Sequence, residues 1–140
     1  MKILIVCGVY YPKISKNLIN QAIKNLKKSK FKYEVLETPG IFEIPVCISR
    51  NIKKYDGFVA LGCVIKGKTP HFDLICQSTF NAIMDISVRY KKPVGNGIIT
   101  ALNMSQAINR SKKSTFKKPN KGSEAAKAVI YSLKNEPKKI

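Results

Sequence analysis

The 140-residue sequence is poor in the side chains that build metal sites. It has a single histidine, His71, and its four cysteines never form a C-x-x-C pair. Because no closed set of ligands at a recognised spacing can be assembled from these residues, we predict no metal site. The cysteines stand singly in apolar surroundings, which is typical of buried, reduced thiols in an intracellular protein: Cys7, Cys47, Cys63 and Cys76.

Long apolar segments are missing as well. No apolar run approaches the roughly 18 residues that a membrane-spanning helix needs, so we predict no membrane association. Residues 1–7 enter a short apolar run directly, without the longer apolar stretch and small-residue cleavage site of a signal peptide. We therefore predict a cytoplasmic protein.

Acidic residues and arginines are scarce, while lysine is abundant. Asp and Glu number 8 against 26 Lys and Arg, which gives a formal net charge of +18, and only 3 of the basic residues are arginines. Such a charge favours an anionic partner, but nucleic-acid readers usually rely on the planar fork of arginine. A general drift of composition toward Lys, Ile and Asn explains the charge equally well. We predict no nucleic-acid partner; steeply salt-dependent binding to DNA or RNA would favour one.

What the sequence does contain is an alternation of short apolar runs and helical apolar stripes, with 44% hydrophobic residues. This pattern is typical of βαβ units around a parallel sheet, in one domain over residues 1–140. Ser15 and Thr69 are predicted to cap helices, with Pro70 opening the second of these. Gly95 and Gly97 indicate that something approaches the last strand closely. The predicted strands are 3–8, 31 up to the turn at 38–40, 57–65 and 94–100. Helices are predicted to begin behind Ser15, near Pro45, at Pro70, at Asn103 and at Asn120, and residues 137–140 are predicted to fray.

The carboxyl ends of parallel strands meet at one edge of the sheet, where open α/β sheets bind their ligands. One segment expected there is residues 66–71. His71 falls in the first turn of a helix, directly after Gly67-Lys68-Thr69, whose backbone N–H groups and ammonium group suit a phosphate. The positive end of the helix disfavours an imidazolium, which suits His71 as a general base. An isolated histidine is also often an ordinary surface or core residue, and both interpretations stay open.

Residues 62–69 match the nucleotide-binding pattern G-x-x-x-x-G-K-[ST] literally. In a working phosphate loop, however, the first glycine ends the strand. Here Cys63, Val64 and Ile65 continue the preceding apolar run, and no later strand ends in an Asp that would hold magnesium. We therefore predict an anion site without a nucleotide.

Three further candidates each have a structural alternative. Tyr10, followed by Tyr11, either stacks on a planar ring or is an ordinary exposed aromatic residue after a strand. Glu43 is either a ligand or the partner of a helix dipole. Arg110, at the end of a short helix, either binds phosphate or is simply solvated.

Five motifs, spread in order over about residues 2–134, resemble those of the 6,7-dimethyl-8-ribityllumazine synthases of riboflavin biosynthesis. The first two are long enough to be highly specific. The motifs are Pro39-Gly-Ile-Phe-Glu-Ile-Pro45, Leu61-Gly-Cys-Val-Ile-Lys-Gly-Lys-Thr-Pro-His-Phe-Asp73, Gly97-Ile-Ile-Thr100, Ser105-Gln-Ala107 and Asn120-Lys-Gly-Ser-Glu-Ala-Ala126.

The resemblance implies a flavodoxin-like three-layer α/β/α sandwich with a four-stranded parallel sheet. It also implies a transferase that condenses 5-amino-6-(D-ribitylamino)uracil with 3,4-dihydroxy-2-butanone 4-phosphate, releasing phosphate and water, with no metal or organic cofactor. Family members form homopentamers with active sites between adjacent subunits, and riboflavin synthase is an expected partner. A non-catalytic relative that only binds lumazine or riboflavin is the alternative.

The resemblance also implies roles for individual residues. His71 is the proton-transfer residue, and Tyr10 stacks on the pyrimidine where the family usually has Phe or Trp. Asn96 stands where many members have Phe, which makes the stacking wall thinner on that side. The remaining implied contacts are Ile41, Phe42 and Glu43 with the ribityl chain and ring; the backbone of Cys63, Val64 and Ile65 with the ring; Lys68, Thr69 and a neighbouring subunit's Arg110 with phosphate; and Asn96 and Lys121 completing the pocket.

Overall fold

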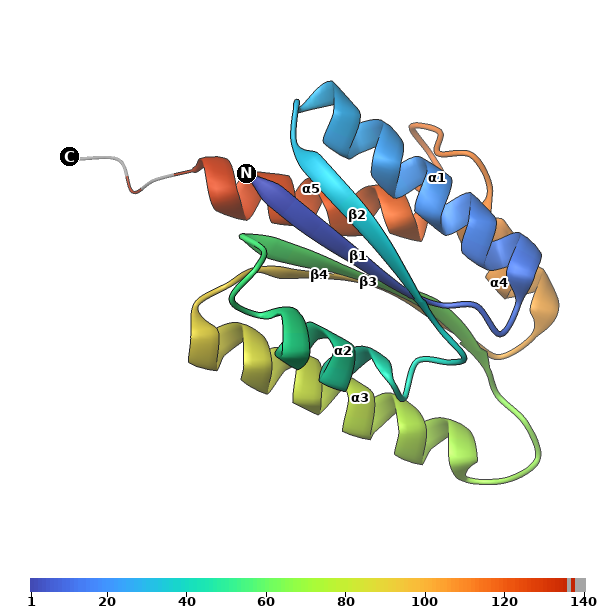
Figure 1. The fold of residues 1–140 in the computed structure, drawn as a ribbon. Coiled ribbons are helices and arrows are strands. Elements are labelled where there is room, and N and C mark those ends of the chain that lie inside the picture. The colour runs from blue at the N-terminus through green and yellow to red at the C-terminus, as the bar shows by residue number, and fades with distance from the viewer. Residues whose placement is uncertain (136, 138–140) are drawn as a thin grey trace.

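The computed structural model describes residues 1–135 and 137 and confirms the α/β fold with a four-stranded parallel sheet (Figure 1). The strands are β1 (Lys2–Gly8), β2 (Lys32–Thr38), β3 (Gly57–Ile65) and β4 (Val94–Ala101). The helices are α1 (Pro12–Lys28), α2 (Ile44–Asn51), α3 (His71–Tyr90), α4 (Met104–Ser111) and α5 (Lys121–Lys134). None of the described helices is long and apolar enough to cross a membrane. Of the tail predicted to fray, residues 138–140 lie outside the described residues.

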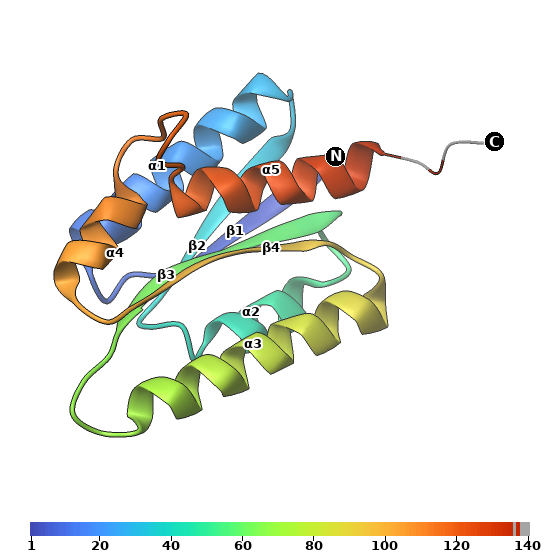
Figure 2. The ribbon, with the colours of Figure 1, turned by 180° about the vertical axis from the view of Figure 1, so that it is seen from behind.

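Helices cover both faces of the sheet and complete the three layers. Figures 1 and 2 show α1, α4 and α5 on one face and α2 and α3 on the other. β1 and β3 are central and buried on both faces, which explains their nearly continuous apolar sequences. Alternate side chains of β1 enter opposite cores: Ile3 and Ile5 pack toward α1 and α5, whereas Leu4 and Val6 pack toward α2 and α3.

The strand order indicates where on the sheet a ligand crevice is expected. The order is β2-β1-β3-β4, so the chain leaves β1 toward one side of the sheet and later returns to build β3 and β4 on the other side. The connections from β1 and β3 therefore diverge at their carboxyl ends. Open α/β sheets bind ligands at such a switch point.

The predicted cap of the first helix is wrong. α1 begins at Pro12, with Tyr11 as its N-cap, because proline is preorganised for the first helical position and needs no N–H partner there. Ser15 instead lies inside the helix, 1% exposed, and its Oγ donates toward the carbonyl oxygens of Gly8 and Tyr11, both at 3.0 Å. The serine thus ties the end of β1 to the start of α1.

The start of α3 also differs from prediction by one residue. Pro70 is the N-cap and His71 the first helical residue, so Thr69 is not the cap itself. Its Oγ1 nevertheless accepts a hydrogen bond from the His71 N–H, at 3.4 Å. The predicted starts of the last two helices, at Asn103 and Asn120, are confirmed, and both residues are N-caps: Asn103 accepts from the Gln106 N–H, and Asn120 accepts from the N–H groups of Gly122 and Ser123.

The two glycines of β4 accommodate a helix. A Cβ on Gly95 would lie 2.1 Å from the carbonyl oxygen of Ala125, and one on Gly97 would lie 3.0 Å from the Cβ of the same residue. The close approach predicted at these positions is therefore that of α5 to the sheet.

We expect Cys7 to make stability sensitive to alkaline pH. Burial in β1 raises the pKa of its thiol from 9.0 to about 12. Between about pH 9 and 12 the unfolded chain releases this proton while the folded chain keeps it, so the free energy of unfolding falls as pH rises, by up to about 1.4 kcal/mol per pH unit. Urea unfolding of the wild type and of Cys7→Ala from pH 8.5 to 11 measures the contribution, since other titrating groups are common to both. If the free energy of unfolding fell equally steeply with pH in the two proteins, Cys7 would make no such contribution.

Candidate active site at the carboxyl end of the sheet

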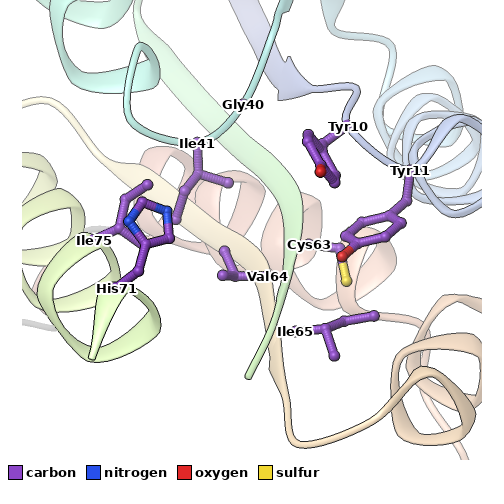
Figure 3. A pocket seen from close by; sticks show the side chains of 9 residues that line it. All are labelled: Tyr10, Tyr11, Gly40, Ile41, Cys63, Val64, Ile65, His71 and Ile75. Carbon is purple, nitrogen blue, oxygen red and sulfur yellow. The ribbon is translucent and has the colours of Figure 1, made fainter. Parts of the chain in front are cut away.

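A cavity of about 230 Å³ opens beyond the carboxyl ends of β1 and β3 (Figure 3). Its walls come from four segments that are distant in sequence: the turn after β1, the loop between β2 and α2, the end of β3 and the first turns of α3. It brings six of the predicted site residues together. The lining residues are Tyr10, Tyr11, Gly40, Ile41, Cys63, Val64, Ile65, His71 and Ile75.

β3 extends past β1 and leaves an open strand edge in this cavity. The ladder between β1 and β3 ends at the pair Cys7 and Leu61, whereas β3 runs on to Ile65 and pairs there with β4 alone. In a parallel ladder, alternate peptide groups face opposite neighbours. Beyond Leu61, every second peptide group of β3 therefore faces the space that β1 has left. Backbone N–H and C=O groups placed in this way can orient a polar ring.

The loop between β2 and α2 lies directly on these strand ends. A Cβ on Gly62 would lie 2.6 Å from Cγ2 of Ile41, so glycine permits the approach that buries Ile41. The carboxylate of Glu43 accepts a hydrogen bond from the Gly40 N–H at 3.2 Å and makes no side-chain cap for α2. Glu43 thus closes the loop that carries Ile41, a role that neither interpretation of the sequence included.

Two tyrosines form one wall of the cavity. Figure 3 shows Tyr10 and Tyr11 on the side opposite His71 and Ile75. The two tyrosine rings are 4.9 Å apart between centroids and meet edge to face, at 74°. Tyr10 is 73% exposed, whereas Tyr11 packs partly against the core. The exposed face of Tyr10 is available for stacking with a planar ligand.

His71 forms the opposite wall, at the N-terminus of the 20-residue helix α3. Its side chain is exposed and also lines an adjoining cavity of about 430 Å³. Phe42 and Glu43 reach this second cavity, so His71 stands between the two groups of predicted contacts. The adjoining cavity is lined by Phe42, Glu43, His71, Leu74, Ile75 and Ser78.

The anion loop, residues 66–70, is exposed between β3 and α3. Lys68 and Thr69 do not line either cavity, but the bond from the His71 N–H to Thr69 holds the loop against the helix N-terminus. β3 continues through Ile65, as predicted from its apolar sequence. In a nucleotide-binding phosphate loop these residues would form the loop, whereas here they form the end of a strand.

The remaining predicted residues lie elsewhere in the chain. Arg110 and Lys121 line a separate cavity of about 370 Å³ between α4 and α5. There Arg110 donates to the carbonyl oxygen of Thr100 at 2.9 Å, and Lys121 pairs with Glu124 at 3.3 Å. Asn96 is exposed on β4, at the edge of the sheet, and accepts from the Ile98 N–H at 3.1 Å. The structure therefore separates Arg110 and Lys121 from the His71 cavity within one chain, and Asn96 lines neither cavity.

Comparison with known proteins decides the family. A family model described as 6,7-dimethyl-8-ribityllumazine synthase matches residues 1–136. The chain belongs to this family. Among curated proteins of that name, the one from Bartonella tribocorum is 40% identical over 134 residues, covering 94% of this chain and 87% of the relative. That of Nitrobacter hamburgensis is 38% identical over 138 residues, with 94% and 83% coverage. The resemblance inferred from the motifs is confirmed, and with it the assignment to an enzyme of riboflavin biosynthesis.

Within this family fold, the sequence motifs did not single out every lining residue. Ile75 lies one helical turn after His71, so the i, i+4 spacing would have placed both on one face of α3. Leu74 and Ser78 extend that face into the adjoining cavity. The sequence suggests Tyr11 only as a stacking partner beside Tyr10, yet it lines the cavity itself.

Cys63 contributes a neutral side chain to the wall of the His71 cavity. Burial raises the pKa of its thiol to about 11, so the sulfur stays protonated near neutral pH and is a poor nucleophile. Among residues 1–135 and 137, no three His, Cys, Asp or Glu side chains gather as a candidate metal site.

Proposed function

We propose that the cavity at the end of β3 is where this chain condenses 5-amino-6-(D-ribitylamino)uracil with 3,4-dihydroxy-2-butanone 4-phosphate. The products are 6,7-dimethyl-8-ribityllumazine, phosphate and water. The observation that carries the proposal is the arrangement of His71 across one cavity from an aromatic wall and an open strand edge.

The pyrimidine substrate would occupy the cavity of about 230 Å³. Its ring would stack on the exposed face of Tyr10, while the backbone of Cys63, Val64 and Ile65 would meet its polar edge. The ribityl chain would extend past Ile41 toward Phe42 and Glu43 in the adjoining cavity. One face of the heterocycle and its polar edge are then recognised by different elements.

Proton transfers and departure of an anion make up the chemistry. The amine attacks the ketone, phosphate leaves and the ring closes with loss of water. His71, exposed at the junction of the two cavities, would shuttle protons in these steps. Lys68 and Thr69 would hold the phosphate at the N-terminus of α3, where N–H groups and the helix dipole favour an anion.

Three of the predicted residues would serve a neighbouring subunit. Arg110, Lys121 and Asn96 do not line the His71 cavity of their own chain, so we propose that they complete the site of the next subunit in a homopentamer. Apolar side chains exposed on the loop before α2, on α2 and along α3 support a covered surface that starts beside that cavity and continues along α3: Phe42, Val46, Leu74, Met84 and Val88. Association with riboflavin synthase and a cytoplasmic location stay predictions.

The direct test is to mix the two substrates with the purified protein and follow the lumazine by its absorbance. We expect product to form at least about 100-fold faster than in the same mixture without protein, because one positioned acid or base alone contributes that much. Tight binding of lumazine or riboflavin without turnover would instead favour the non-catalytic alternative. If the protein showed no turnover and bound neither lumazine nor riboflavin, the proposed function would be refuted.

A further inference from the structure

The backbone of Tyr11 is held by hydrogen bonds at the start of α1. Tyr11 is the N-cap of α1, between the end of β1 and the helix-opening Pro12. Its carbonyl oxygen accepts hydrogen bonds from both the N–H and the Oγ of Ser15, at 2.9 and 3.0 Å. With its backbone anchored and its ring packed against both the core and Tyr10, its side chain is directed into the cavity.

The hydroxyl group of Tyr11 is not used by the fold. Within the part of the chain that the structure describes, it makes no hydrogen bond, although the ring is only partly exposed. The buried Tyr55 differs, since its hydroxyl donates to Glu34. Burial, with the nearby Cys63 as a smaller cause, raises the pKa of Tyr11, so its hydroxyl remains a hydrogen-bond donor at neutral pH.

The neighbours of Tyr11 indicate which part of a ligand it meets. Tyr10, on one side, offers a ring face for stacking. Cys63 and Ile65, which share the cavity wall with Tyr11, belong to the open edge of β3. His71 lies on the opposite side (Figure 3), and the anion loop directly precedes it in the chain. The Tyr11 hydroxyl is therefore placed to donate a hydrogen bond to the polar edge of a stacked heterocycle, away from the phosphate.

We propose that the Tyr11 hydroxyl donates a hydrogen bond to a carbonyl oxygen of the pyrimidinedione ring, which makes Tyr11 a specificity-determining residue. This inference rests on the proposed function. A ring that offers no carbonyl oxygen at that edge leaves the hydroxyl without a partner and binds more weakly.

Tyr11→Phe tests the hydroxyl alone, because it keeps the ring and its packing. We expect the KM for the ribitylaminouracil to rise about 5- to 10-fold, the usual effect of losing one neutral hydrogen bond. The kcat and the KM for the butanone phosphate should stay within about twofold, since no reacting atom is touched. Tyr131→Phe, exposed on α5, is the matched control and should change neither constant. An unchanged KM for the uracil in Tyr11→Phe would overturn the inference.

A second measurement identifies the contacted group. Product lumazine and its 2-thio and 4-thio analogues, in which sulfur replaces one ring carbonyl oxygen, are titrated into both proteins. One thio substitution should weaken binding to the wild type but not to Tyr11→Phe, because sulfur accepts hydrogen bonds poorly. Equal losses in both proteins, for both analogues, would show that the hydroxyl contacts neither carbonyl oxygen. Absence of turnover by the wild type would refute the proposed function, and these titrations would still test Tyr11.

Discussion

Replacing His71 with alanine is expected to reduce kcat for lumazine formation by about 100-fold, near the lower end of the range for a positioned general acid or base. The lower end applies because His71 is exposed, so water can take over part of the proton transfer. Steady-state kinetics with both substrates saturating would measure the effect, since binding is then separated from chemistry.

The exposure of His71 also supplies a control for this variant. Added imidazole can reach the vacated position and should restore part of the rate of His71→Ala. The restored rate should increase in proportion to the concentration of neutral imidazole. Imidazole should not accelerate the wild type or Lys127→Ala, an exposed position on α5 outside the cavities described. A His71→Ala enzyme with an unchanged kcat would exclude His71 from proton transfer.

Chains carrying His71→Ala and chains carrying Arg110→Ala are expected to restore activity when they assemble together. Alone, Arg110→Ala should raise the KM for the butanone phosphate by about 10- to 100-fold, the loss expected for a charge-assisted hydrogen bond. In the proposed assembly, each site takes His71 from one chain and Arg110 from the next. Equal amounts of the two variants, unfolded and refolded together, then give both native side chains in about a quarter of the sites.

The geometry makes this experiment decisive. His71 and Arg110 line separate cavities that share no residue. If a single chain supplied both side chains to one site, every site in the mixture would lack one of them and activity would stay at the level of the single variants. Variants refolded separately and then mixed without exchange should show only the average of their two activities.

Much of the fold follows from local sequence patterns. The apolar run 57–65 is β3 as predicted, because a central parallel strand is buried on both faces and tolerates almost no polar residue. The helix starts at Asn103 and Asn120 are likewise confirmed, since each N-cap contact involves only residues within three positions. The prediction of a cap at Ser15 is wrong because Pro12, three residues earlier, is already suited to the first helical turn.

The candidate site was only partly predictable. His71, Glu43 and Tyr10 were identified because each follows a strand at the carboxyl edge of the sheet. Contacts across the cavity were not predictable: the close approach of Ile41 to Gly62 and the place of Tyr11 in the wall depend on how the loop after β2 and the turn after β1 pack against β3. Such contacts join residues distant in sequence, so no spacing within one segment predicts them.

The sequence by itself determined the order of strands and helices, the family and the chemical types available for the reaction, because apolar periodicity and motifs are properties of neighbouring residues. Only the tertiary structure decided which of those residues meet. It placed α5 against Gly95 and left the peptide groups of β3 open beyond Leu61. It also separated Arg110 from His71 within one chain. These outcomes depend on strand order and on packing between layers, which bring together residues that no local pattern links.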